Sequence, residues 1–160
     1  MTGVRVPTPA AMSDLGRRLA AVLRAGDVVV LSGELGAGKT TLTQGIGAAM
    51  DVRGPVTSPT FVIARVHPPL GDGPPLVHVD AYRLATLAEV DDLDLDASLE
   101  DSVTVVEWGA GMVEGLAQSR LDVTISRSAG AGDEVRTVTV RGVGPRWDGV
   151  DLDLVDSPAD

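Results

Sequence analysis

Apolar positions near the amino terminus recur at the spacing expected of one helix face. They follow a short apolar segment at residues 4–6 and are Met12, Leu15, Leu19, Val22 and Leu23. Thr8 suits a helix N-cap, Pro9 suits the first helical turn, and Gly26 suits a helix end. The pattern predicts a strand followed by a core-packing helix that ends at Gly26.

Further along the chain, apolar runs alternate with turn-forming segments. Residues 27–32 form a continuous, β-branched run that predicts a buried strand, and residues 40–50 can continue as a helix. Residues 60–66 and 76–80 have the composition of strands and flank a segment rich in proline and glycine, residues 68–75. We expect these two strands to form a hairpin with a long connection.

The second half of the chain predicts both helical and strand segments. Residues 84–99 are acidic and fit one or two helical pieces, and residues 112–117 fit a helical turn or two. Residues 103–106 have the composition of another buried strand. Residues 121–125 and 135–140 alternate apolar with polar positions, which predicts a half-exposed antiparallel hairpin.

The chain length and the distribution of apolar residues predict one domain. A chain of 160 residues fits a single core, which buries roughly two-thirds of the unfolded surface. We expect a folded α/β domain over residues 1–143. The remaining residues, 144–160, carry five aspartates and few core candidates, so we expect an acidic, loosely ordered tail.

Composition and charge narrow the classes of function. A net charge of -10 and an aromatic content of 2% oppose direct binding to nucleic acid, so we expect a partner to hold any RNA. The absence of cysteine excludes disulfides and thiolate zinc sites. The amino terminus lacks a secretion-signal pattern, and Arg24 and Asp27 interrupt the longest apolar stretch. We therefore expect a cytoplasmic protein that does not enter the membrane.

Lysine occurs once among the thirteen basic residues, at Lys39 in a glycine-rich octet. Residues 33–40 read GELGAGKT and match G-x-x-x-x-G-K-[ST], the Walker A phosphate-binding loop of P-loop proteins. In such a loop backbone N–H groups and the lysine bind nucleotide phosphates, and the following hydroxyl, here Thr40, binds Mg²⁺. The predicted nucleotide-binding residues are Gly33, Glu34, Leu35, Gly36, Ala37, Gly38, Lys39, Thr40 and Thr41.

The predicted elements around this octet favour a phosphate-binding loop over a glycine-rich turn with an ordinary surface lysine. A strand precedes the octet and a helix follows it, so the positive end of the helix dipole would face the phosphates. Gly33, Gly36 and Gly38 can adopt backbone angles closed to other residues, which lets phosphate oxygens approach the main chain.

Two acidic residues that end predicted strands are candidates for metal binding and catalysis. Asp80 and Glu107 each follow an apolar run, so both should emerge at the carboxyl edge of the sheet, where open α/β folds bind ligands. Mg²⁺ usually takes one or two protein oxygens together with phosphate and water. One acid could hold the metal while the other orients the attacking water, or either could simply begin a solvated loop.

Several nearby polar residues have both a structural and a functional interpretation. Ser58 and Thr60 lie where nucleotide enzymes often keep a loop ordered by the γ-phosphate, although a capped turn containing Pro59 explains them equally well. His78, inside a strand, is typical of a satisfied core histidine. Arg83 could form a structural salt bridge or contact a phosphate or a partner.

Four motifs in this order resemble the TsaE family, formerly YjeE, the ATPase component of bacterial tRNA threonylcarbamoyladenosine (t6A) biosynthesis. They are GELGAGKTT at residues 33–41, SPTF at 58–61, HVDAYR at 78–83 and EW at 107–108. The resemblance implies a P-loop NTPase-like, three-layer α/β/α fold. The central sheet would be mixed and mainly parallel, with an antiparallel C-terminal hairpin.

The resemblance also implies ATP and Mg²⁺ as cofactors, weak ATPase activity, and TsaB and TsaD as protein partners. In that family TsaD modifies the tRNA and the ATP cycle of TsaE supports repeated turnover, so tRNA is met only through the complex. Lys39, Asp80 and Glu107 are then the catalytic candidates, and Thr40, Asp80 and Glu107 the metal candidates. The candidates for a nucleotide-responsive loop or for partner contacts are Ser58, Thr60, Phe61, His78, Tyr82, Arg83 and Trp108.

Two other functions fit a phosphate-binding loop. A small-molecule kinase should carry arginines on a lid, but only Arg120 and Arg127 are candidates and both lie in strand-like surroundings. A nucleotide-gated binding module would use ATP to order residues 58–61, with hydrolysis incidental. A GTPase is excluded, since the chain has no asparagine and no second lysine for the guanine-selecting pattern Asn-Lys-x-Asp.

Overall fold

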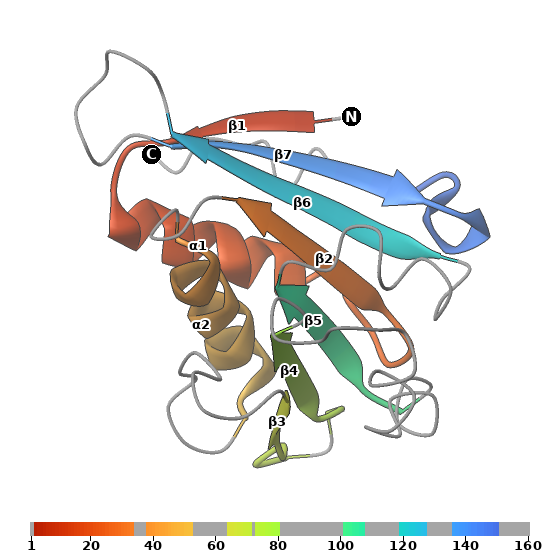
Figure 1. Cartoon of the computed structure of the whole chain (residues 1–160). Coiled ribbons are helices and arrows are strands. Elements are labelled where there is room, and N and C mark those ends of the chain that lie inside the picture. The colour runs from red at the N-terminus through yellow and green to blue at the C-terminus, as the bar shows by residue number, and fades with distance from the viewer. Residues whose placement is uncertain are drawn as a thin grey trace.

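The computed structural model describes residues 2–33, 38–52, 64–71, 73–80, 101–107, 119–127 and 136–150. Within these residues seven strands form one sheet in the order β1-β7-β6-β2-β5-β4-β3 (Figure 1). The strands are β1 (Thr2–Val6), β2 (Val28–Gly33), β3 (Ala64–His67), β4 (Leu76–Asp80), β5 (Val103–Glu107), β6 (Arg120–Arg127) and β7 (Arg136–Val143). The helices are α1 (Pro9–Ala20), α2 (Lys39–Met50) and the short 3-10 helix η2 (Pro145–Trp147).

The sheet is parallel at its centre and antiparallel at both edges. Strand β2 pairs in parallel with β5 and β6, and β4 pairs in parallel with β5. The pairs β3–β4, β6–β7 and β1–β7 are antiparallel, so the two predicted hairpins are confirmed. The mixed α/β fold is also confirmed. The described pairings divide evenly between the two directions, however, because the amino-terminal strand returns to pair with β7.

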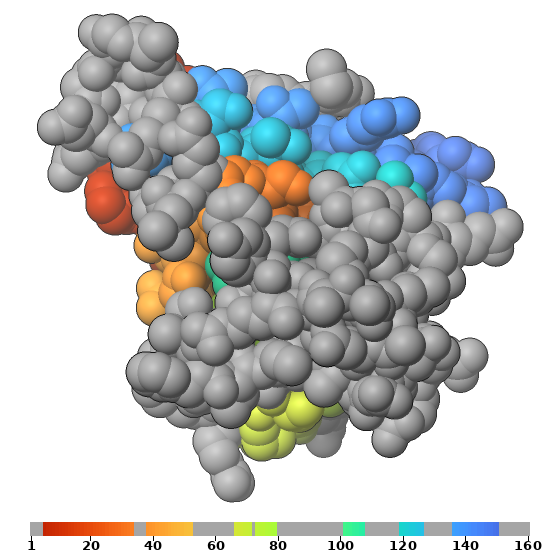
Figure 2. Space-filling model, viewed as in Figure 1, coloured from red at the N-terminus to blue at the C-terminus, as the bar shows by residue number. Residues whose placement is uncertain are grey.

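The C-terminal hairpin is half-exposed, as its alternating pattern predicts. Val123 of β6 and Val140 of β7 are buried and pair in register, whereas Thr124 and Arg141 are exposed. Strands β6 and β7 reach the surface along one side of the space-filling view, where they are cyan and blue (Figure 2).

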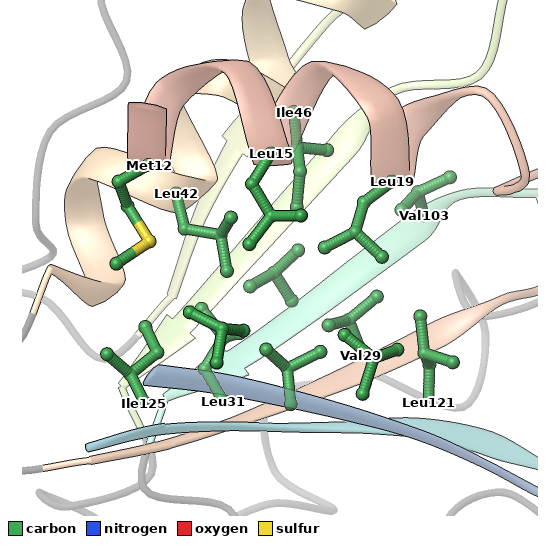
Figure 3. Close-up of a cluster of buried hydrophobic side chains, with 14 of the residues drawn as sticks. Met12, Leu15, Leu19, Val29, Leu31, Leu42, Ile46, Val103, Leu121 and Ile125 are labelled. Carbon is green, nitrogen blue, oxygen red and sulfur yellow. The ribbon is translucent and has the colours of Figure 1, made fainter. Parts of the chain in front are cut away.

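Both helices pack on the same face of the sheet (Figure 1). The core between helices and strands includes Met12, Leu15, Leu19, Val29, Leu31, Leu42, Ile46, Val103, Val105, Leu121 and Ile125 (Figure 3). At the crossing of α1 and α2, a Cβ added to Gly16 or Gly45 would collide with the backbone of the other helix. This close approach fixes the position of α2.

The opposite face of the central strands is also apolar and buried. Its residues include Val28, Val30, Val77, Val79 and Val106. Strands buried on both faces are typical of a parallel sheet covered by helices on each side. The helices predicted at 84–99 and 112–117, and with them the expected third layer, lie outside the described residues. Neither α1 nor α2 is long and apolar enough to cross a membrane.

Helix α1 begins where predicted but ends earlier. The Thr8 hydroxyl oxygen accepts a hydrogen bond from the backbone N–H of Ala11 at 3.1 Å, which confirms the N-cap. The helix ends at Ala20 rather than at Gly26. Val22 and Leu23 lie beyond the helix but still pack against the core. Their spacing therefore resembles two further positions on the apolar face of the helix.

Residues 144–150 differ from the loosely ordered tail expected from residue 144 onward. They contain η2, and the Trp147 side chain is buried against Gly142, with a relative exposure of 6%. The Arg146 guanidinium lies over the Trp147 ring at 4.2 Å and pairs with Asp27. This part of the chain therefore belongs to the folded domain, while residues 151–160 lie outside the described residues.

Candidate functional site

The strand and helix that flank the predicted phosphate loop are present. Strand β2 ends at Gly33 and α2 begins at Lys39, with Gly38 as its N-cap. Gly38 has φ 113°, a left-handed conformation that favours glycine. The positions between them, Glu34, Leu35, Gly36 and Ala37, lie outside the described residues, so the conformation of the loop itself stays a prediction.

The two long helices differ at their amino termini. Helix α1 is capped by the Thr8 side chain, whereas the N-cap of α2 is Gly38, which forms no side-chain capping hydrogen bond. The first N–H groups of a helix have no partner within the helix, and together with the helix dipole they favour a bound anion. Thr40 and Thr41 are half-buried in this first turn. The amino terminus of α2 is therefore suited to phosphate.

Lys39 is buried at this helix terminus, with a relative exposure of only 6%. Its Nζ donates a hydrogen bond to the Gly33 carbonyl oxygen at 2.9 Å, so the side chain folds back toward the end of β2. The Thr43 hydroxyl donates to the Lys39 carbonyl at 2.8 Å, one turn further along α2. The alternative of an ordinary surface lysine is therefore wrong.

Met12 supports this site from α1, a role that the sequence does not predict. A Cβ added to Gly38 would lie 3.2 Å from the Met12 Cε atom. The thioether thus packs directly against the residue that starts α2. Periodicity assigns Met12 to a packing helix, but no local signal pairs it with Gly38.

The two candidate acids end adjacent strands at the same sheet edge. Asp80 is the last residue of β4 and pairs in register with Glu107, the last residue of β5. Leu31 of β2 pairs with Glu107 from the other side, two residues before the predicted phosphate loop begins. Glu107 has a relative exposure of 4%, so its alternative role as the start of a solvated loop is wrong.

His78 lies beside Glu107, a contact that the separate motifs do not predict. It is fully buried in β4, and its Nε2 lies 3.2 Å from the Glu107 Oε2 atom. This distance is within the range of an ion pair, but the two groups are not oriented as in a hydrogen bond. Neither ring nitrogen has a hydrogen-bond partner in the described structure. The sequence carries only a partial signal, because each residue shares the parity of a core residue in its own strand, Leu76 in β4 and Val105 in β5.

Several predicted site residues cannot be placed in this geometry. Ser58, Thr60, Phe61, Tyr82, Arg83 and Trp108 lie outside the described residues, and their roles stay predictions. Of the two arginines considered for a kinase lid, both lie in β6, and Arg120 pairs with Asp122 at 2.9 Å. Neither arginine therefore belongs to a helical lid.

The described groups can bind an anion and place a carboxylate nearby. An uncapped helix terminus and a buried ammonium group supply positive charge, and a buried carboxylate ends a neighbouring parallel strand. In open α/β sheets this carboxyl edge is the usual ligand site.

Comparisons with known proteins agree with this arrangement. The family profile described as threonylcarbamoyl adenosine biosynthesis protein TsaE matches residues 6–137. The chain is 66% identical over 146 residues to the tRNA threonylcarbamoyladenosine biosynthesis protein TsaE of Streptomyces coelicolor, covering 90% of this chain and 99% of that protein. It is 38% identical over 146 residues to the protein of that name from Bacillus subtilis, covering 90% and 87%.

A solved structure extends the similarity to the fold. The crystal structure of Bacillus subtilis YdiB superposes with a TM-score of 0.75 at 34% identity, covering 95% of this chain and 92% of that one. The profile match and the relatives span most of the chain, including the strands and helices that build the site. The chain therefore belongs to the TsaE family.

Proposed function

We propose that this protein is a cytoplasmic, Mg²⁺-dependent ATPase that supports tRNA threonylcarbamoyladenosine biosynthesis together with TsaB and TsaD. One observation carries the ATPase proposal. A buried lysine at an uncapped helix terminus shares a sheet edge with a buried carboxylate on a parallel strand. The part in tRNA modification rests on membership of the TsaE family and on the names of the similar proteins.

The positively charged groups would bind the nucleotide phosphates. The Lys39 ammonium already lies at the end of β2, where a side-chain movement would let it exchange its hydrogen bond with Gly33 for phosphate oxygens. The uncapped N–H groups of the first turn of α2 would bind further phosphate oxygens. The contact with Met12 would hold Gly38, and thus the end of the loop, in place.

The oxygen donors at this edge fit Mg²⁺. The candidates are the Thr40 hydroxyl and the carboxylates of Asp80 and Glu107, and Mg²⁺ prefers such hard oxygen ligands. Mg²⁺ usually takes only one or two ligands from the protein and the rest from phosphate and water. When bound, Mg²⁺ would offset the negative charge that develops on the phosphate oxygens.

The tRNA would be held by the partner proteins rather than by this chain. A net charge of -10 gives little attraction for a polyanion. The contribution of this chain would instead be its ATP cycle. Binding of ATP and loss of the γ-phosphate after hydrolysis change the local charge, and such a change can switch the conformation of a neighbouring loop that a partner contacts.

Hydrolysis measured with and without partners tests this proposal. We expect slow ATP consumption by the chain alone, and faster consumption with TsaB, TsaD and substrate tRNA. A non-hydrolysable ATP analogue should not sustain repeated tRNA modification. Full modification with the analogue would instead favour the nucleotide-gated binding module, and ATP consumption that requires a small metabolite would favour the kinase.

A further inference from the structure

The imidazole of His78 is buried beside the carboxylate that we assign to the ATPase reaction. We propose that His78 is a positioning residue that holds Glu107 in its reactive orientation, an inference that rests on the proposed function. The Nε2 atom lies 3.2 Å from Oε2 of Glu107, and the side chains have relative exposures of 0% and 5%. No other described side chain forms a hydrogen bond or ion pair with Glu107.

The strand register explains why these two side chains meet. His78 pairs with Val105 of β5, and the next pair on the same face is Asp80 with Glu107. Parallel strands direct paired residues to the same side of the sheet, so His78 lies one step below the two acids. Any rotation of the Glu107 side chain therefore changes its distance from the fully buried ring of His78.

Packing alone does not explain a histidine at this position. The neighbouring residues of β4, Val77 and Val79, are buried valines, and Leu76 on the same face as His78 lies in the apolar core. An aliphatic side chain would suit these surroundings, whereas the histidine carries two ring nitrogens that lack hydrogen-bond partners in the described structure. Leaving a buried polar group unpaired reduces stability.

The contact between His78 and Glu107 would act in catalysis when nucleotide is bound. Catalytic hydrogen bonds are often long or poorly aligned before the substrate binds, and they tighten in the reactive complex. At 3.2 Å, the Nε2 and Oε2 atoms are already close enough for a hydrogen bond, so only their relative orientation has to change. Mutating a residue that orients a catalytic or metal-binding side chain typically lowers activity by about tenfold to a hundredfold.

A double-mutant cycle tests whether His78 acts through Glu107. We expect His78→Leu to lower ATP turnover about tenfold or more while the affinity for a non-hydrolysable ATP analogue changes less than about threefold. His78→Gln, which keeps a side-chain N–H donor, should recover part of the turnover. When Glu107 is already replaced by glutamine, adding His78→Leu should change turnover less than about twofold.

Urea unfolding without nucleotide supplies a readout other than activity. The effects of His78→Leu and Glu107→Gln on stability should be non-additive, because the two side chains touch. Val77→Ala is the matched control, since this buried residue of the same strand faces the other side of the sheet. It should lower stability and leave turnover unchanged.

The outcomes separate this proposal from the proposed function. If Glu107→Gln lowers turnover but the effect of His78→Leu is absent, or is equally large in both backgrounds, the positioning role is wrong and the ATPase stands. Equal losses for His78→Leu and His78→Gln would likewise contradict it. If the wild-type chain with its partners hydrolyses no ATP, the proposed function itself fails. Should His78→Leu not fold, His78→Gln carries the same cycle.

Discussion

Two buried carboxylates lie at opposite ends of the parallel strands, and their surroundings differ. Asp27, just before β2, is 4% exposed and accepts hydrogen bonds from the Arg24 N–H at 2.8 Å, the Arg146 Nε at 2.9 Å and the Arg146 Nη2 at 3.1 Å. Glu107, at the end of β5, is equally buried, but the one polar contact of its side chain in the described structure is the 3.2 Å approach of His78.

The difference separates a structural acid, Asp27, from Glu107, the acid to which we assign a function by proposal. A buried charge is stable when its hydrogen-bonding capacity is used, as that of Asp27 is. Among the described residues, the Glu107 carboxylate is approached only by His78, and we propose that its remaining capacity serves a metal ion or a water molecule. Incomplete pairing of a buried acid costs stability. Such an exchange of stability for activity is expected of active sites.

The largest effect on stability is expected at the amino end of the strands. Arg146→Ala leaves the buried Asp27 charge with one of its three hydrogen bonds, so the free energy of unfolding should fall by about 3 kcal/mol. ATP affinity should stay unchanged, because the pair lies at the end of β2 opposite the loop. Urea unfolding and calorimetric titration with ATP measure the two quantities.

Arg141→Ala is the matched control, because Arg141 is an exposed arginine on β7. Its effect on stability should stay within about 0.5 kcal/mol. If both arginine variants were equally stable, residues 144–150 would not contribute to the domain as the Arg146–Asp27 pair implies.

Two glycines with positive φ give a smaller effect that distinguishes the loop from the rest of the chain. Gly38 has φ 113° and Gly149 has φ 75°, so alanine at either should cost about 1–2 kcal/mol of stability through backbone strain. Only Gly38→Ala should weaken ATP binding, because its Cβ would press on Met12 at the start of α2. Equal ATP affinities for the two variants would show that Gly38 does not shape the site.

The smallest expected change in stability comes from neutralising Glu107. Glu107→Gln should leave the free energy of unfolding within about 1 kcal/mol of wild type, or raise it, because it removes a poorly compensated buried charge. Asp27→Asn should instead lower it by about 1–3 kcal/mol, because the amide NH₂ cannot accept hydrogen bonds. Of these two variants, only Glu107→Gln should lower ATP turnover. A larger loss of stability for Glu107→Gln than for Asp27→Asn would reverse the comparison.

The carboxyl end of the sheet was largely predictable because its signals are local. The spacing around Lys39 predicts the strand before the loop and the helix after it, both of which are confirmed, while the loop itself stays a prediction. Apolar runs ending in Asp80 and Glu107 place both acids at one edge. The His78–Glu107 contact required the pairing of β4 with β5. That pairing depends on tertiary structure, although the parity of the two residues is consistent with it.

The contacts at the amino end of the strands were not predictable, because they too depend on tertiary structure. The Arg146–Asp27 pair joins residues 119 positions apart, and neither residue lies in a motif. The five aspartates after Gly144 predict a solvated tail. The composition of this segment gives no sign that Arg146 and Trp147 pack against the domain. The contact between Met12 and Gly38 is likewise a tertiary contact, which helical periodicity cannot pair.

Calorimetric titration of Lys39→Ala with Mg²⁺ and a non-hydrolysable ATP analogue tests the central claim most directly. Arg17→Ala is the control, because it removes the same charge from an exposed position on α1. We predict that Lys39→Ala weakens binding by about tenfold to a hundredfold while the fold is retained, and that Arg17→Ala binds as wild type does. Unchanged affinity in a folded Lys39→Ala variant would contradict the assignment of this sheet edge as the nucleotide site.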